Sequence, residues 1–132
     1  MQDRPTAVEL LKAAQEFCER DLQPNLTGRV RFHARVLQNV LGILEREWAG
    51  EGHAVRDEWE RLRLLLDADT QPPATLESLK EAVATWNREL SGRIRSGAMD
   101  DRWDETVDAV YQTVLAKLEI ASPRYSAPSS EA

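Results

Sequence analysis

The chain has 132 residues, of which 42% are hydrophobic and 30% are charged, a composition typical of one globular domain that needs no disulfide or metal to fold. Its net charge of -6 argues against general nucleic-acid binding, which requires clustered Lys and Arg to neutralise phosphates. No apolar stretch is long enough for a membrane span, and the first residues lack the apolar region of a signal peptide. Because Cys18 has no partner for an internal disulfide, we expect a cytoplasmic protein.

The first expected helix begins at a capping box and ends at a proline. Thr6 and Glu9 have the capping-box spacing, so we expect a helix from there to about Leu22. Its inner stripe consists of Leu10, Leu11, Ala14, Phe17 and Cys18. Pro24 cannot supply the amide of a continuing helix and predicts a break over residues 23–26. A connection this short favours an antiparallel hairpin with the next helix.

The segment from Thr27 to Trp48 is expected to be the central helix. At about 100° per residue, its apolar side chains cover an arc of roughly 200°. They are Val30, Phe32, Ala34, Val36, Leu37, Val40, Leu41, Ile43, Leu44 and Trp48. Because one neighbour cannot bury so wide an arc, we expect packing on at least two sides. The glycines at residues 49–52 predict the end of this helix.

Three more helices are expected after these glycines. They cover residues 54–66, residues 75–97 and a segment from Asp100 or Asp101 to Pro123, with a proline-containing loop at residues 67–74. All four tryptophans fall on inner stripes and are expected in the core: Trp48, Trp59, Trp86 and Trp103. Residues 126–132 lack the apolar surface needed for order. The predicted fold is therefore all-α, a single-domain bundle of about five helices over residues 1–125.

The sequence predicts no metal site, no cofactor site and no complete catalytic constellation. His33 and His53 are far apart, and no helix carries a Glu-x-x-His pattern. Residues 50–52 lack the lysine of a phosphate-binding loop. Cys18 lies on an apolar stripe, which favours a small core residue over a nucleophile.

His33 is the first polar feature that needs an explanation, because it falls within the apolar arc. A buried imidazole without a partner costs about 1–3 kcal/mol. Asp21 lies in the last turn of the first helix and Arg29 lies one turn before His33. We favour a structural polar cluster of Asp21 with Arg29 or His33, since buried polar residues usually pair with each other. The alternative is that Arg29 and His33 line a pocket for an anionic ligand.

The second polar feature is a ridge formed by Arg31, Arg35 and Asn39. Their i, i+4, i+8 spacing places them along one face of the helix. The ridge could be a solvated face, or it could pair with acidic residues of the last helix. Those residues are Asp101, Asp104, Glu105 and Asp108. It could also be an exposed binding face, because Arg is well suited to carboxylate and phosphate groups.

Six segments together resemble one bacterial domain family of unknown function. They are Arg4-Pro5-Thr6, Glu9-Leu10-Leu11, residues 28–36 with Asn39, residues 94–97, residues 113–118, and Pro123-Arg124-Tyr125. One departure is Ser122, where the family pattern has Asn. The resemblance implies a protein encoded beside, or fused to, kinases similar to aminoglycoside phosphotransferases, or encoded beside acyl-CoA dehydrogenases. It supplies no active-site residues.

Two functions are consistent with this context. The first is a non-catalytic helical accessory module that binds a phosphotransferase-like kinase or an acyl-CoA dehydrogenase. The alternative is a binder of a small anionic ligand, such as an acyl-CoA or a phosphorylated intermediate. The candidate binding residues are Arg29, Arg31, His33, Arg35, Asn39 and Arg124. The helix at residues 75–97, with its narrow apolar stripe and Trp86, leaves room for a homodimer face. An enzymatic role for His33 as a base ranks third, because no nucleophile accompanies it.

Overall fold

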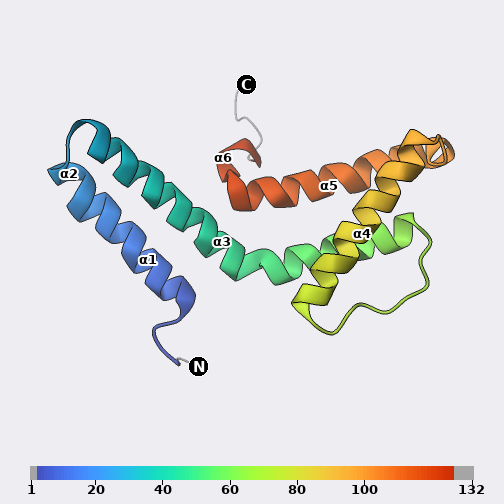
Figure 1. Cartoon of the computed structure of the whole chain (residues 1–132), viewed down its shortest axis with the longest axis horizontal. Helices are drawn as coiled ribbons and strands as arrows, with labels where there is room; N and C mark the ends of the chain where they lie inside the picture. The colour runs from blue at the N-terminus through green and yellow to red at the C-terminus, as the bar shows by residue number, and fades with distance from the viewer. Residues whose placement is uncertain (1–2, 127–132) are drawn as a thin grey trace, which may run out of the picture. The chain divides into compact units, whose positions relative to one another are not determined.

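The computed structural model describes residues 3–126, and all regular secondary structure in that range is helical, as predicted (Figure 1). The elements are α1 (Ala7–Phe17), the π-helical turn η1 (Cys18–Leu22), α2 (Gln23–Asn25), α3 (Gly28–Leu65), α4 (Leu76–Arg95), the 3₁₀ turn η2 (Asp100–Arg102), α5 (Trp103–Ala121) and α6 (Pro123–Ser126). No helix in this range is long and apolar enough to cross a membrane. Ser126 ends α6, and the rest of the tail predicted to be disordered lies outside the described residues.

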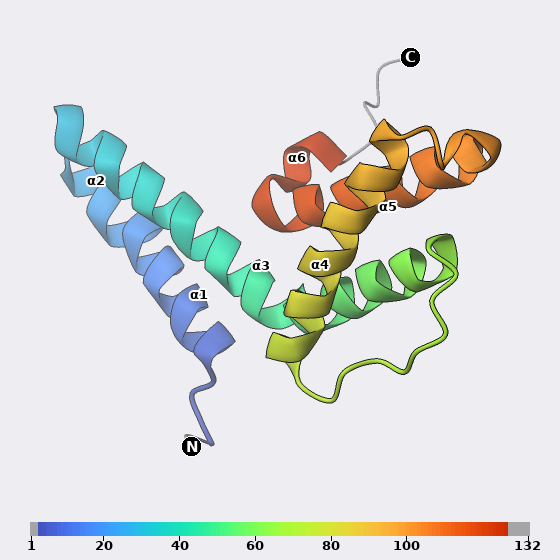
Figure 2. The same ribbon diagram turned by 45° about the vertical axis from the view of Figure 1, so that its right-hand side comes forward.

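The chain divides into two compact units, Met1–Glu51 and Gly52–Ala132, and α3 contributes to both of them. The first unit is an antiparallel hairpin, as the short connection predicts. Gln15 Nε2 donates to Glu45 Oε2 at 3.3 Å, and Gln23 Nε2 donates to Gln38 Oε1 at 2.5 Å. The earlier residue of the first helical arm, Gln15, pairs with the later residue of α3, Glu45, and the later Gln23 pairs with the earlier Gln38. The two arms therefore run antiparallel. Figure 2 shows α1 alongside the first half of α3.

The start of α1 confirms the predicted capping box, but its end differs from the prediction. The Thr6 amide donates to Glu9 Oε2 at 2.7 Å, and the Glu9 amide donates to Thr6 Oγ1 at 3.2 Å. The helix does not end near Leu22, because η1 and α2 continue it to Asn25. Pro24 lacks an amide and its ring would collide with an α-helical carbonyl four residues earlier. The wider π turn, in which the Gln23 amide donates to the Cys18 carbonyl, accommodates that ring.

The hairpin leaves seven of the ten apolar side chains of the predicted arc exposed, so the predicted enclosure of this helix is wrong. Of the other three, Leu41 and Ile43 are half-buried and only Ala34 is fully buried. Ala34 and Gly42 are buried, as is Cys18 in the other helical arm of the hairpin. The side chain of Gln15 lies over Gly42, because a Cβ on Gly42 would be 3.4 Å from Gln15 Oε1. The large apolar residues exposed on α3 are not buried by this seam.

The predicted end of the central helix at residues 49–52 is also wrong, because α3 continues through both glycines to Leu65. Neither Gly50 nor Gly52 adopts a positive φ. A glycine inside a helix costs only about 1 kcal/mol relative to alanine, and favourable neighbours offset that cost. The predicted helix at residues 54–66 is therefore the C-terminal part of α3.

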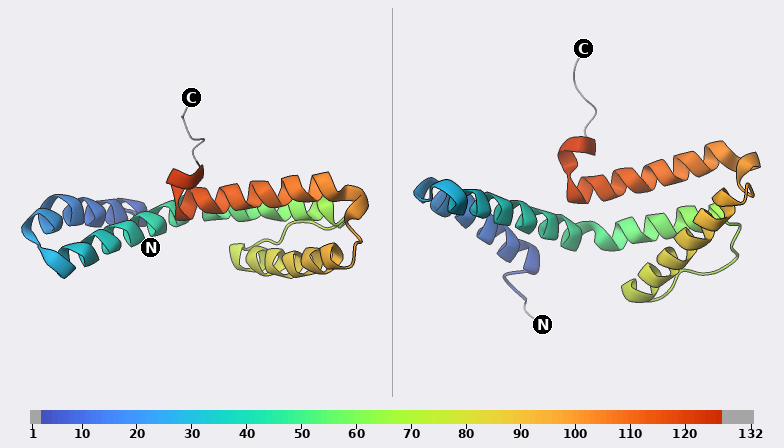
Figure 3. Two further views of the ribbon diagram at one scale, coloured as in Figure 1. Left: turned by 90° about the horizontal axis from the view of Figure 1, so that it is seen from above. Right: turned by 45° about the horizontal axis from the view of Figure 1, so that its top comes forward.

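The second unit packs the C-terminal part of α3 against α4 and α5 (Figure 3). Its core is formed by Trp59, Leu62, Leu65, Leu66, Leu79, Val83, Leu90 and Met99. Trp59 is only 2% exposed and its ring stacks on Trp86 at a centroid distance of 5.3 Å. These two tryptophans confirm the predicted core role. Trp48 and Trp103 do not, because they are 71% and 51% exposed.

Helix ends in the second unit agree with the sequence at three of four points. Thr75 caps α4 by accepting from the Ser78 amide at 3.2 Å, and Gly97 follows its last turn with φ +79°. Pro123 follows the end of α5. Neither Asp100 nor Asp101 caps α5, because both lie in the turn η2.

Candidate functional site

Arg29 and His33 meet on the exposed surface of the first unit. Arg29 Nε donates to His33 Nε2 at 3.2 Å. The bond joins residues one helical turn apart, as expected for i, i+4 neighbours. Both side chains are exposed, so the prediction that His33 is buried is wrong. The cause is the rotation of α3 within the hairpin, which turns its apolar arc away from α1.

Asp21 does not join this pair, which corrects the predicted three-residue cluster. Its backbone carbonyl accepts a bond from Asn25 Nδ2 at 2.8 Å, and its side chain is exposed. Asp21 lies within η1, and the π turn rotates this part of the chain relative to a continuous α-helix. In its place, the register of the hairpin is fixed by the Gln23–Gln38 bond.

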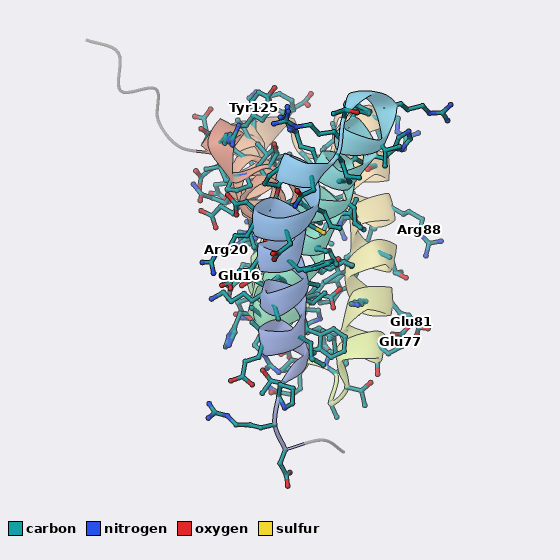
Figure 4. All side chains as sticks on the ribbon, turned by 90° about the vertical axis from the view of Figure 1, so that its left-hand side faces the viewer. Glu16, Arg20, Glu77, Glu81, Arg88 and Tyr125 are labelled. Carbon is teal, nitrogen blue, oxygen red and sulfur yellow. The ribbon has the colours of Figure 1, made fainter. Side chains whose placement is uncertain are left out.

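The predicted ridge is exposed along its whole length in the first unit. Arg31, Arg35 and Asn39 all have solvent-exposed side chains. Neither Arg31 nor Arg35 takes part in an ion pair within the described part of that unit, residues 3–51. The exposed pair of Arg20 and Glu16 is an example of the ion pairs that do form there (Figure 4). The pairing of the ridge with acidic residues of α5 stays a prediction.

Arg124, the remaining predicted binding residue, lies in α6 and therefore belongs to the second unit. Its side chain is exposed, as is that of its neighbour Tyr125, which Figure 4 shows beside α6. The other five candidates all lie on α3 in the first unit.

An apolar surface of α3, made by seven exposed large side chains, lies beside the ridge. We call it the α3 apolar face, and its members are Val30, Phe32, Val36, Leu37, Val40, Leu44 and Trp48. Five of them follow one another at intervals of four residues from Phe32 to Trp48, so they form one row along the helix. The ridge forms the adjacent row, whereas Arg29 and His33 fall within the face in projection, between Val36 and Leu44. The sequence correctly predicted this arc but not its exposure.

The second unit contains a polar cluster that sequence reasoning missed. Glu58 is 6% exposed, and its Oε1 accepts bonds from Asn87 Nδ2 at 2.8 Å and from Lys117 Nζ at 3.0 Å. These three residues come from α3, α4 and α5 and tie the helices together. A signal was present in the sequence, because in a helical projection Glu58 falls between Leu62 and Leu65 on the inner stripe.

Beside this cluster lies a cavity of about 190 Å³ between the same three helices. Its walls include Leu62, Leu90, Ala109, Val110 and Val114 together with Arg61, Asn87, Thr113 and Lys117. Within the described residues, Nε and Nη2 of Arg61 are buried and have no hydrogen-bond partner. Arg61 also lines a second cavity of about 180 Å³, whose other polar residues are Arg102, Glu105 and Asp108.

The pKa shifts in this unit come from exposed ion pairs. Hydrogen bonds from Arg63 lower the pKa of Glu60, and the same bonds raise the pKa of Arg63. A hydrogen bond to Glu105 is the main cause that raises the pKa of Arg102, whose guanidinium also donates to the Leu65 carbonyl at 2.9 Å and to Asp67 at 3.0 Å. Arg102 thereby joins the start of α5 to the end of α3. In residues 3–126, no cluster of His, Cys, Asp and Glu is placed to hold a metal ion.

The fold and these surfaces define an all-helical protein with an exposed apolar helix face in one unit and an arginine-lined cavity in the other. The chain belongs to the family described as Domain of unknown function (DUF6285), whose model matches residues 24–125. No curated protein and no solved structure matches the chain. The family match begins just before α3, so it includes the ridge, the α3 apolar face and both cavities lined by Arg61, but not α1.

Proposed function

We propose that this protein is a non-catalytic helical accessory module that binds a protein partner through the α3 apolar face. The observation that carries the proposal is the exposure of seven large apolar side chains on one helix, from 44% for Val36 and Val40 to 71% for Trp48. Scattered exposed apolar residues are common, but a contiguous apolar patch with a polar border is typical of an interaction surface.

The composition of the face suits protein recognition. Trp48 lies at one end of the row and Phe32 at the other, and aromatic residues supply much of the binding energy at interfaces. Arg31 and Arg35 border the row along its length and would contact acidic groups at the rim of the partner. A partner with an apolar groove and an acidic edge therefore fits this surface.

The family resemblance of the sequence suggests the identity of the partner. It implies a phosphotransferase-like kinase or an acyl-CoA dehydrogenase encoded nearby, and both are large enough to offer a groove for a helix. A non-catalytic role is consistent with the exposed position of His33, whose Nε2 is already used as an acceptor by Arg29. A general base needs that lone pair for the proton that it removes.

The test is association of the full chain with each neighbouring enzyme, measured by co-purification and by titration at micromolar concentrations. The Leu44→Glu variant should weaken binding by about 10- to 100-fold, because burying a leucine contributes about 1.5–3 kcal/mol. Leu64→Glu is the matched control, since Leu64 is 58% exposed on α3 but lies in the second unit, and it should bind like the native chain. No association with either enzyme, and no effect on its activity, would refute the proposal.

A second function is binding of a small anion, such as an acyl-CoA or a phosphorylated intermediate, by the ridge and its neighbours. It is favoured by the absence of acidic partners for Arg31 and Arg35 in the described part of the first unit. A thermal-shift series with coenzyme A, acyl-CoAs and sugar phosphates tests it. The double variant Arg31→Gln, Arg35→Gln should abolish any stabilisation, and a flat response of the native chain would refute it.

A further inference from the structure

Arg61 in the second unit is half-buried, and two of its guanidinium nitrogens lack hydrogen-bond partners. Its Nε and Nη2 atoms are buried without a hydrogen-bond acceptor, and a charged group in that state is strongly unfavourable. These two nitrogens form the edge of the guanidinium that donates two parallel hydrogen bonds. Their natural partner is a planar carboxylate that accepts both bonds at once.

None of the carboxylates beside Arg61 in sequence or at its two cavities accepts a hydrogen bond from its Nε or Nη2. Asp57, one helical turn before Arg61 on α3, is exposed. Glu58 accepts from Asn87 and Lys117, and Glu105 accepts from Arg102 at 2.8 Å. Asp108 is exposed and lines only the second cavity beside Arg61. Arg61 also lines the first cavity, beside the Glu58 cluster, where a bound ligand could supply the acceptor.

The first cavity defines the rest of the ligand. Its walls are apolar at Leu62, Leu90, Ala109 and the two valines of α5, and Thr113 already donates its hydroxyl to the Ala109 carbonyl at 3.0 Å. Its volume of about 190 Å³ is sufficient for a compact apolar body, since a cavity of about 150 Å³ holds benzene. Exposed Val110, Val114 and Lys117 lie along it, so it opens to solvent there.

We propose that this cavity binds a small monocarboxylate with a compact apolar body, and that Nε and Nη2 of Arg61 hold its carboxylate after a small rotation of the guanidinium. The net charge at the site is one positive, from the cations Lys117 and Arg61 and the anion Glu58. This charge matches a monoanion. The site belongs to the second unit alone and is independent of the surface proposed for a protein partner.

The experiment is an NMR titration of the full ¹⁵N-labelled chain with benzoate, followed at the backbone amides and at the arginine Nε–H signals. Benzoate should bind with a Kd of about 0.1–1 mM and should shift the Arg61 Nε–H signal. Benzamide, which lacks the charge, and inorganic phosphate, which lacks the apolar body, should each bind at least about 10-fold more weakly.

Three variants test whether Arg61 and the cavity together bind the carboxylate. Arg61→Lys should weaken benzoate binding by about 10-fold or more, because lysine cannot form the paired bonds. Val110→Trp should block the cavity without unfolding the protein, since Val110 is 42% exposed. Arg88→Gln is the control, because Arg88 is an exposed arginine on the outer side of α4 (Figure 4) and should have no effect.

Three results would overturn the proposal. They are an absence of saturable shifts at about 10 mM benzoate, equal affinity for benzamide, and unchanged binding in Arg61→Lys. Asp108→Asn provides a further test and should bind benzoate like the native chain. Binding that appears only in this variant would show that Arg61 is paired with Asp108 in solution, and would overturn the proposal as well.

Discussion

Replacing Gly50 and Gly52 with alanine should stabilise the protein, because both glycines lie inside α3. Neither has a positive φ, and an added Cβ would meet no atom within 4 Å at either position. In a helix interior, alanine is favoured over glycine by about 0.5–1 kcal/mol. The double variant should therefore gain about 1–2 kcal/mol. With an m-value of about 1–3 kcal/mol/M, the urea midpoint should rise by roughly 0.3–2 M.

The assay is urea unfolding followed by far-UV circular dichroism, with Gly97→Ala as the matched control. Gly97 adopts φ +79° at the end of α4, and a Cβ there would lie 3.2 Å from Asp100 Oδ2. Alanine should therefore destabilise at this position by about 1 kcal/mol. A loss of stability in Gly50→Ala or Gly52→Ala would show that the helix ends at these residues and would refute the continuity of α3.

Three further predictions concern the second unit. Trp59→Ala should cost about 3–5 kcal/mol of unfolding free energy, whereas exposed Trp48→Ala should change it by less than about 0.5 kcal/mol; equal urea midpoints would contradict the burial that distinguishes them. Glu58→Leu should destabilise more than Glu58→Gln, by about 1–3 kcal/mol in thermal and urea unfolding, because only glutamine keeps an acceptor for the amide on α4. Because the pKa of Glu60 is lowered in the folded state, its bond with Arg63 contributes fully to the free energy of unfolding at pH values above the ordinary pKa of glutamate. This contribution is lost as the pH falls through the folded-state pKa. The stability difference between the native chain and Glu60→Gln should therefore shrink with acidification from neutral pH to pH ~3, and a difference that grows would contradict this sign.

Local features of the fold could be predicted because their chemistry is contained within a few residues. The capping box at Thr6 and Glu9, the cap at Thr75 and the left-handed end at Gly97 all depend on near neighbours in the sequence. The antiparallel hairpin also follows from a short connection. These features required no knowledge of which helix faces pack together.

The burial of α3 could not be predicted, because an apolar arc does not specify what covers it. The sequence contains an arc from Phe32 to Trp48, but the hairpin closes at one edge of it, through Ala34 and the adjacent Gly42. The candidate site changed for the same reason. His33 was expected to be buried with Asp21, and the exposed surface instead pairs it with Arg29.

The first cavity beside Arg61 could not be predicted from the inner stripe of α3 alone. Arg61 lies at the edge of that stripe, and arginine in such a position usually reaches solvent along its long side chain. Only the packing of α4 and α5 removes the Nε and Nη2 atoms of Arg61 from water.

Because the π turn lies just before Pro24, this single proline determines how α1 is rotated about its own axis. A turn of this kind holds one residue more than an α-helical turn, so each residue before it is rotated by about 100° relative to an unbroken α-helix. Cys18, the first residue of this turn, is 3% exposed, whereas Phe17, the last residue of α1, is 53% exposed. If Pro24 were replaced by alanine, an ordinary α-helical turn could form, and a different side of α1 would then meet α3.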